Sequence, residues 1–291
     1  MYKNILATIS FVTLFISGFA ISTSESDSEV KAYSKFVPER EDDFAWENDK
    51  VAFRVYGPSS RSPGAISGVD CWLKRVDYSI IDKWYKAHTE GISYHTDWGE
   101  GHDPYHVGAT RGCGGTAIWI KGNPYPAGSF TAWRIIENEG TRTAFELDYV
   151  WNTALGKVQE TKSISLTMGS QLFQVNSKFL LNGKPAKNLS IAIGLSTHNG
   201  KASIYQDEKI GWIATWEKIA GHHLGTGARV NPDLIDNIIE RQSQEKDKSH
   251  IWLISHTDEQ GQFEYSAGYA WERAGEFDNI QSWKSYLSSD D

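Results

Sequence analysis

The fold class is set by the stretch Ala144-Phe145-Glu146-Leu147-Asp148-Tyr149-Val150-Trp151. Large apolar side chains occupy every second position of this stretch, and mostly small or charged side chains lie between them. A period of two residues is typical of a strand that has one face on a core and the other in water. The stretch is therefore predicted to be a half-buried strand of an antiparallel sheet.

The same period recurs along the chain. It appears at 51–56, 131–137, 160–167, 171–181, 189–195, 211–217, 250–256 and 263–271, and turn sequences such as Asn182-Gly183 separate these segments. Helical patterns are few and cover 80–88, 280–287 and 231–239, where Asn231 is a cap and Pro232 fits the first turn. This balance predicts an all-β fold: a large antiparallel two-sheet β-sandwich, like a supersandwich, with a few short helices.

The beginning of the chain is typical of an exported protein. Lys3 precedes an apolar run over 5–19, and Gly18 and Ala20 are small residues placed for signal-peptide cleavage. We therefore expect a signal peptide over 1–20, a periplasmic or secreted location, and no membrane insertion after cleavage. Residues 21–36 are polar and predicted to be disordered, and 37–291 are predicted to form a single β-sandwich catalytic domain.

Composition narrows the class of partner. The formal net charge of −8 argues against nucleic acid, because phosphate binding needs a clustered basic surface. Twelve Trp, thirteen Tyr and twelve Phe fit both a sandwich core and stacking on sugar rings. Cys71 and Cys113 are the only cysteines, and they either form a disulfide in an oxidising compartment or stay as buried thiols.

The stretch from Tyr94 to His106 is the densest in chemical groups. It holds His95, Asp97, Glu100, His102, Asp103, Tyr105 and His106 among glycines. Loops on a rigid β scaffold concentrate binding and catalytic groups. Three interpretations remain open: a divalent metal site built from the His, Asp and Glu side chains, a set of proton-transfer or substrate-contacting groups, and a structural hydrogen-bonded loop.

Other candidate groups lie outside that stretch. His198 follows an apolar strand and precedes a turn, and His222 lies in a glycine-flanked pair of histidines. Arg54 and Arg111 are candidates for gripping a carboxylate with two hydrogen bonds, and the alternative for Arg54 is an ion pair with Asp42, Asp43, Glu47 or Asp49. The serine-nucleophile, phosphate-loop and dinucleotide motifs are absent from the sequence.

Several motifs carry a resemblance to a known family. They are Pro38–Asp49, Ala52–Pro58, Gly68-Val69-Asp70-Cys71-Trp72, Tyr94–Gly101 and Gly112-Cys113-Gly114-Gly115. With these motifs the chain resembles an uncharacterised-domain family of proteins exported by polysaccharide-degrading bacteria. Within that family the likeness extends to the ulvan oligosaccharide dehydratases of marine bacteria.

The resemblance implies an enzyme that removes water across C4 and C5 of the terminal uronic acid at the non-reducing end of an acidic, sulfated oligosaccharide. We assign the roles from the chemistry of the residues. The predicted catalytic residues are His95, Tyr105, His198 and His222. The predicted substrate-binding residues are Arg54, Arg111, Trp46, Trp98 and His102. No cofactor is firmly predicted, and a divalent metal stays open. The alternative functions are a polysaccharide lyase that acts by β-elimination and a non-catalytic carbohydrate-binding protein.

Overall fold

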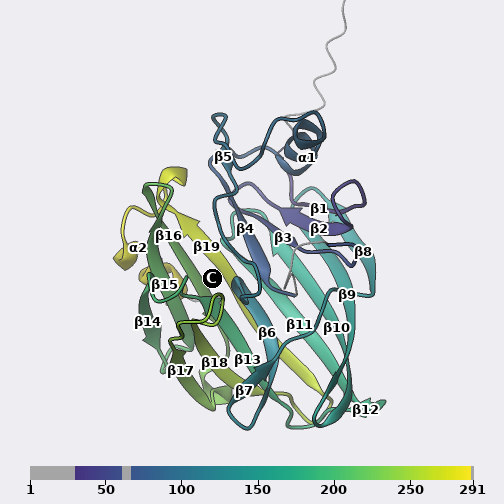
Figure 1. Ribbon diagram of the computed structural model, residues 1–291. Helices are drawn as coiled ribbons and strands as arrows, with labels where there is room; N and C mark the ends of the chain where they lie inside the picture. Colours follow the sequence, from purple (N-terminus) through teal and green to yellow (C-terminus); the bar gives the residue numbers. More distant parts are fainter. Residues whose placement is uncertain (1–29, 61–66, 290–291) are drawn as a thin grey trace, which may run out of the picture.

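The computed structural model describes residues 30–60 and 67–289, and within them nineteen strands form three antiparallel sheets (Figure 1). The first sheet has the order β1-β2-β3-β4-β5, with the bounds Tyr33–Val37, Asp43–Glu47, Ala52–Val55, Val69–Lys74 and Gly101–His102. Another five-stranded sheet has the order β17-β18-β13-β6-β7, with the bounds Asn237–Arg241, His250–His256, Ser190–Ser196, Cys113–Ile120 and Asn123–Tyr125.

The largest sheet has nine strands in the order β14-β15-β16-β19-β11-β10-β9-β8, and β12 pairs with β11. In that order the bounds are Ser203–Asp207, Trp212–Ile219, His222–Arg229, Gln262–Trp271, Leu172–Leu181, Gly156–Thr167, Arg142–Thr153 and Ala132–Glu139, with β12 at Lys184–Pro185. The helices are α1 (Ile81–Thr89), α2 (Ile280–Leu287) and two 3-10 turns, η1 (Pro232–Leu234) and η2 (Glu272–Ala274).

The sheets form two layers. The two five-stranded sheets adjoin where Val69 of β4 and Gly112 make a parallel bridge, and together they cover one face of the nine-stranded sheet (Figure 1). The all-β prediction is confirmed, and the layer opposite the large sheet consists of two sheets rather than one. The helices predicted at 80–88 and 280–287 are α1 and α2.

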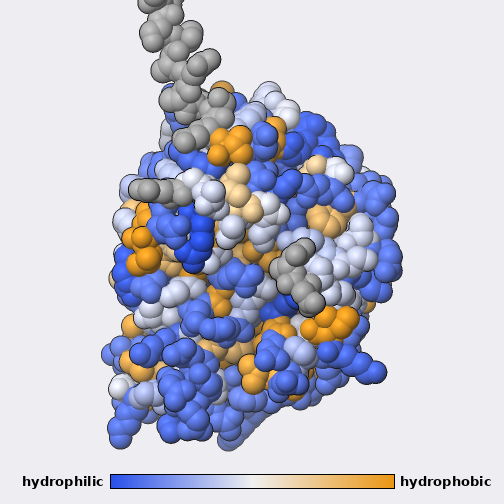
Figure 2. Space-filling view, turned by 180° about the vertical axis from the view of Figure 1, so that it is seen from behind, coloured by the Kyte–Doolittle hydropathy of each residue, from blue (hydrophilic) through white to orange (hydrophobic). Residues whose placement is uncertain are grey.

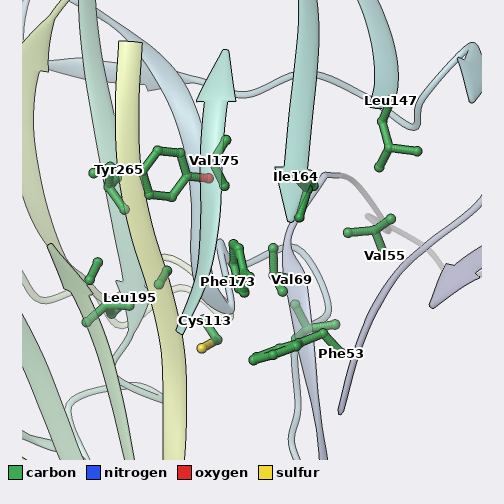
Figure 3. Close-up of a cluster of buried hydrophobic side chains, with 14 of the residues drawn as sticks. Phe53, Val55, Val69, Cys113, Leu147, Ile164, Phe173, Val175, Leu195 and Tyr265 are labelled. Carbon is green, nitrogen blue, oxygen red and sulfur yellow. The ribbon is translucent and has the colours of Figure 1, made fainter. Parts of the chain in front are cut away.

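The core lies between the layers, as the period of two predicted. Phe145, Leu147 and Tyr149 of β9 are buried on the inner face, and Glu146 and Asp148 between them face outward. Figure 3 shows inner side chains from both layers meeting in one cluster; those labelled are Phe53, Val55, Val69, Cys113, Leu147, Ile164, Phe173, Val175, Leu195 and Tyr265. The face of the molecule that is turned away from the viewer in Figure 1 has a mostly hydrophilic surface (Figure 2).

The helix predicted over 231–239 is wrong. The cap forms as expected, because the Asn231 side chain accepts a hydrogen bond from the Asp233 N–H at 3.1 Å. The helical turn nevertheless ends at Leu234. Ile238 lies in the edge strand β17, where it pairs with Leu253 of β18. A short apolar run fits either a helix or a strand, and here the open edge of β18 decides between them.

The start of the folded chain also needs correction. Residues 33–36, assigned to the disordered segment, belong to β1, where Phe36 pairs with Phe44 and stacks on Trp133 with ring centroids 4.9 Å apart. The predicted signal peptide and residues 21–29 lie outside the described residues. Among the residues that are described, no helix has the length and apolar character required to cross a membrane.

The two cysteines are buried and adjacent. Both are free thiols, and Cys113 Sγ donates a hydrogen bond to the Gly268 carbonyl at 2.9 Å. Burial raises the pKa of the Cys71 thiol well above its ordinary value, and the neighbouring Cys113 raises it further. Both residues therefore behave as core side chains in this structure.

Strand β16 was not predicted, because glycines interrupt its period. Gly225 and Gly227 face α2, and a Cβ atom at Gly227 would lie 2.9 Å from carbons of Leu287 and Trp283. The absence of side chains lets α2 pack directly on the strand. The glycines that hide the strand in the sequence are therefore required by its packing.

We predict that Gly227→Ala destabilises the protein by about 1–3 kcal/mol, because the added methyl group overpacks the contact with α2. Chemical denaturation followed by tryptophan fluorescence measures the change. Gly128→Ala is the matched control, since a Cβ atom there meets nothing within 4 Å. Equal stability of the two variants would contradict this account of β16.

Candidate functional site

A cavity of about 350 Å³ opens at one rim of the sandwich. Loops that follow β5 and β13 form its walls together with the end of β15 and the segment before β18. Its lining residues are Pro104, His106, Thr110, Ser196, His198, Asn199, Lys201, Glu217, Lys218, Ile219, Lys246, Asp247 and Ser249. Two histidines, two carboxylates and three lysines thus meet in one cavity.

His198 is held at both ring nitrogens. Its Nδ1 lies 2.5 Å from Glu217 Oε1, and its Nε2 lies 2.9 Å from the carbonyl oxygen of His106. A carbonyl oxygen can only accept, so Nε2 carries a hydrogen. Burial lowers the pKa of His198, but the hydrogen bond and charge of Glu217 outweigh burial, and the net pKa is raised. The site therefore favours a fixed imidazolium at His198.

His106 forms a second pair in the same cavity. Its Nε2 lies 2.9 Å from Asp247 Oδ1, and Asp247 Oδ2 accepts the Ala109 N–H at 3.1 Å. Gly108 has a φ of +46° and makes room for the pair, since a Cβ atom there would lie 2.5 Å from Asp247 Oδ2. Within the described residues the His106 Nδ1 has no hydrogen-bond partner, and half of the side chain is exposed. A carboxylate-oriented imidazole with one open nitrogen is suited to proton transfer.

Tyr105 supports this arrangement from inside the protein. Its ring packs edge-on against His198 with centroids 4.8 Å apart, and only 5% of the residue is exposed. Burial raises the pKa of Tyr105 well above its ordinary value, so the phenol stays protonated. Its hydroxyl has no partner among the described residues. Tyr105 thus contacts a predicted catalytic residue from behind the cavity.

The other two predicted catalytic histidines lie elsewhere. His222 begins β16 and pairs with Ile219, which lines the cavity, so it lies just beyond the cavity wall. His95 is more than half exposed and lies over Asp103, with its Nδ1 2.8 Å from the Asp103 carbonyl oxygen. The structure brings Tyr105 and His198 into contact, with His222 nearby, and sets His95 apart.

Arg54 does not reach the surface. Only 3% of it is exposed, and its guanidinium contacts Asp70, lies 3.3 Å from Asp103 and 3.6 Å from Asp43. The alternative ion pair is what the structure shows, and Asp43 is one of the partners that the sequence offered. Burial raises the pKa of Asp43 to about 6, because its effect is larger than that of the Arg54 charge, which lowers this pKa.

Three other predicted substrate contacts are buried. Arg111 is 1% exposed and donates to Ser67 Oγ at 3.1 Å, and burial lowers its pKa to about 10. Trp46 lies in the core, stacked on Phe53 with centroids 5.5 Å apart. His102 is 8% exposed beside Trp271. A substrate meets neither Arg111 nor Trp46 unless these elements move.

Trp98 is exposed but lies at a different hollow. It is 68% exposed and borders an apolar space of about 330 Å³ between α1 and the loop over 92–101. Trp84, Ile92 and Tyr94 line the same space. This hollow has apolar walls and lacks the paired histidines of the cavity around His198.

A larger hollow, about 1320 Å³, lies over the outer face of the nine-stranded sheet. Two pairs of its polar residues are bonded to each other: Ser163 donates to Glu146 at 2.8 Å, and Asn176 donates to Glu264 at 2.5 Å. Its size alone does not make it a site of chemistry. We place the candidate site at the smaller cavity because proton-transfer groups converge there.

The residues proposed as metal ligands point to other partners. Asp97 binds Arg75 and Arg273, Glu100 binds Lys83, and Asp103 binds Arg54. Over residues 30–60 and 67–289, no group of three or more His, Cys, Asp or Glu side chains is arranged to hold a metal ion. The dense stretch is therefore divided among several separate networks.

Residues 18–290 match a family described as a domain of unknown function (DUF4861). The chain belongs to the DUF4861 family. A relative in Formosa agariphila, Uncharacterized protein P7, is 38% identical over 275 residues, which cover 90% of this chain and 68% of the relative. The family resemblance seen in the motifs is thereby confirmed at the level of this domain.

Solved structures of three carbohydrate-related enzymes also align with this DUF4861 chain. The GH36 α-galactosidase AgaA of Geobacillus stearothermophilus aligns over 78% of the chain with a TM-score of 0.35 and 10% identity. The 4-α-glucanotransferase of Thermococcus litoralis aligns over 82% with a TM-score of 0.34 and 10% identity. The chain spans 40% of each of these proteins. A galactose mutarotase related enzyme of Lactobacillus acidophilus aligns over 78% of the chain and 97% of its own, with 9% identity and a TM-score of 0.28. Scores this low carry no argument about activity.

Six charged or titratable groups of this cavity had no role assigned from the sequence. His106 was named in the dense stretch without a role, whereas Glu217, Asp247, Lys201, Lys218 and Lys246 were not singled out. Glu217 lies near the end of β15, on the face of the strand that is directed to the core. An acidic residue is unusual at such a position, and this was the one feature of the sequence that could have indicated a functional role for Glu217. Asp247 and Lys201 lie in polar segments that give no local signal.

We predict that Glu217→Gln lowers the pKa of His198, because the neutral amide removes the charge that outweighs burial. NMR titration of the imidazole resonances measures the shift. The raised pKa also makes the pair stabilising below the pKa of an unfolded histidine, and this contribution is lost as pH rises through the folded pKa.

The variant should therefore lose stability at acidic pH and little at alkaline pH. Glu272→Gln is the matched control, because Glu272 pairs with His223 at 3.1 Å outside the cavity. An unchanged His198 titration in Glu217→Gln would show that Glu217 does not set the charge of this imidazole.

Proposed function

We propose that the chain is a carbohydrate-active dehydratase that eliminates water across C4 and C5 of a terminal uronic acid on an acidic oligosaccharide. The observation that supports it most is the convergence of the His106–Asp247 pair, the His198–Glu217 pair and three lysines in one cavity. The sulfated, ulvan-type substrate follows from the resemblance of the motifs.

The first requirement of the reaction is a positive charge at the uronate carboxylate. Removing the C5 proton puts negative charge on that carboxylate, and a nearby cation stabilises it. Lys201, Lys218 and Lys246 line the cavity. With the His198 imidazolium they give more positive groups than the two carboxylates of the site can balance. The lysines take the role that the sequence assigned to Arg54 and Arg111.

The second requirement is a base, and His106 fits it best. Asp247 holds Nε2–H, which leaves Nδ1 as the nitrogen with an open lone pair. Asp247 is itself fixed by the Ala109 N–H. The Nδ1 atom takes the C5 proton, and the electron pair of the C5–H bond becomes the C4=C5 double bond.

The third requirement is a proton for the departing oxygen. As the C4–O4 bond breaks, the hydroxyl group leaves with its electron pair and takes the Nε2 proton of the His198 imidazolium, which gives up its hydrogen bond to the His106 carbonyl, and water forms. Glu217 then accepts the hydrogen bond of a neutral His198. Proton exchange with solvent returns His106 and His198 to their starting states.

A lyase that expels a sugar would use the same groups. The difference lies in the leaving group, which is a glycosidic oxygen instead of the O4 hydroxyl. A non-catalytic binding protein would use the lysines alone and leave the His106–Asp247 pair without a role. The three functions differ in their products: a dehydrated oligosaccharide, a shortened chain, or no product.

We predict that the protein converts a saturated, uronate-terminated ulvan oligosaccharide into a product one water lighter with new ultraviolet absorbance. His106→Ala and Asp247→Asn should each lose about 10²–10⁴-fold in kcat, since general base catalysis is worth that much. His256→Ala is the matched control, because His256 pairs with Asp236 at 3.0 Å outside this cavity.

Mass spectrometry and absorbance follow the product, and polymer viscosity tests for internal cleavage. Chain shortening with a fall in viscosity would assign the lyase function instead. Binding without any product over long incubation would assign the binding function. Full activity of His106→Ala would remove the base proposed here.

A further inference from the structure

A second cluster of charged groups adjoins the cavity and has no role in the elimination. Arg75 follows β4 and Arg273 lies in η2, and both guanidinium groups bind the carboxylate of Asp97. Each arginine side chain is 29% exposed, and Asp97 is 15% exposed. Two cations on one carboxylate leave the group with a net positive charge.

Asp97 is firmly held even without the arginines. Its Oδ1 accepts the N–H groups of Gly99 at 2.8 Å and Gly101 at 3.2 Å. Burial raises the pKa of Asp97, but these two bonds and Arg75 outweigh it and bring the pKa down to about 2. Among the described residues, Asp97 is the only carboxylate in ion-pair contact with Arg75 or Arg273. In the described part of the chain each guanidinium makes one hydrogen bond, to Asp97, so most of its N–H groups have no acceptor there.

Two histidines, His102 and His222, lie beside the arginine cluster. Burial lowers the pKa of His102, Asp97 raises it, and Arg273, Arg75 and His222 lower it further, so these groups are neighbours. His102 Nδ1 is buried and has no hydrogen-bond partner in the described chain. The partly exposed guanidinium groups of Arg75 and Arg273 are therefore the donors that a ligand with acceptor atoms would meet.

The cluster and the cavity are linked along two chain segments. His222 pairs with Ile219, which lines the cavity, and His102 precedes the lining residue Pro104 by two positions. Two residues of extended chain span about 7 Å, which is on the scale of one sugar residue. His102 and His222, which neighbour the arginine cluster, therefore lie within about one sugar length of residues in the cavity wall.

We propose that Arg75 and Arg273 form a subsite for an oxyanion group, a sulfate ester or a carboxylate, on the sugar next to the one in the cavity. This inference rests on the proposed function for the position of the substrate. Guanidinium groups match such oxyanions because two N–H donors reach two oxygens at once. Asp97 holds both forks in place before the ligand arrives, which lowers the entropy cost of binding.

Binding to His106→Ala protein tests the subsite without turnover. Calorimetry measures Kd for a sulfated, uronate-terminated oligosaccharide and for its desulfated and carboxyl-reduced forms. In this background Arg75→Gln and Arg273→Gln should each weaken binding of the intact oligosaccharide about tenfold or more. The loss should shrink for whichever modified oligosaccharide lacks the recognised group.

Arg134→Gln is the matched control, because Arg134 is another partly exposed arginine in ion pairs, with Glu146 and Asp148, and lies on the outer face of the large sheet. Arg273→Lys keeps a cation on Asp97 and should retain more affinity than Arg273→Gln if the fold is intact. Unchanged affinity in both glutamine variants, or an equal loss for all three oligosaccharides, would overturn the subsite. Failure of the elimination alone would show instead in the absence of product from the unmodified protein.

Discussion

The ion pair between Arg54 and Asp103 is the constraint on which the loop over 94–106 and the candidate site depend. Asp103 lies in the middle of the loop that carries the candidate groups, and it is held inside the protein by a buried guanidinium that also binds Asp70. The backbone N–H of Asp103 donates to the Tyr94 carbonyl at 2.9 Å, which fixes the loop a second time. Because Asp103 is fixed, the residues that precede and follow it in the chain are held in defined directions.

This anchoring explains how one short loop serves several sites. Inward-pointing Tyr105 packs against His198, whereas His102 lies beside Trp271 at the arginine cluster. Pro104 and His106 line the cavity. A loop without a buried anchor would sample many conformations, and a mobile base is a poor catalyst because orientation carries much of the rate enhancement. The energetic cost of burying Arg54 is offset by three carboxylates and by the Tyr94 hydroxyl at 3.2 Å.

Alternation of apolar residues was sufficient to predict the strands that have one buried and one exposed face. It failed where both faces of a strand are covered or glycine-rich, as in β16, and where a short run such as Ile235 to Ile239 fits two structures. The site was only partly accessible from sequence. His198 and Tyr105 stood out by local context, but the acidic partners of the cavity histidines did not. His106 and Asp247, for example, are 141 positions apart and meet only through the fold. The presence of an arginine in the sequence does not show whether its side chain is buried, so Arg54 and Arg111 were both predicted to be available to substrate.

The distribution of cations follows from the same physics. Arg54 and Arg111 are inside. Arg54 is paired with carboxylates and with the Tyr94 hydroxyl, whereas Arg111 donates to the Ser67 hydroxyl and the Thr116 carbonyl and its Nη2 has no partner among the described residues. Lysines line the cavity, where a compact and flexible ammonium can follow a carboxylate as its charge grows. Arg75 and Arg273 are intermediate, partly exposed and fixed by Asp97. The protein as a whole is acidic, at −8, so an anionic sugar is repelled by most of the surface. For the acidic substrate proposed above, local positive charge at the cavity and its neighbouring cluster would set both the place and the direction of binding.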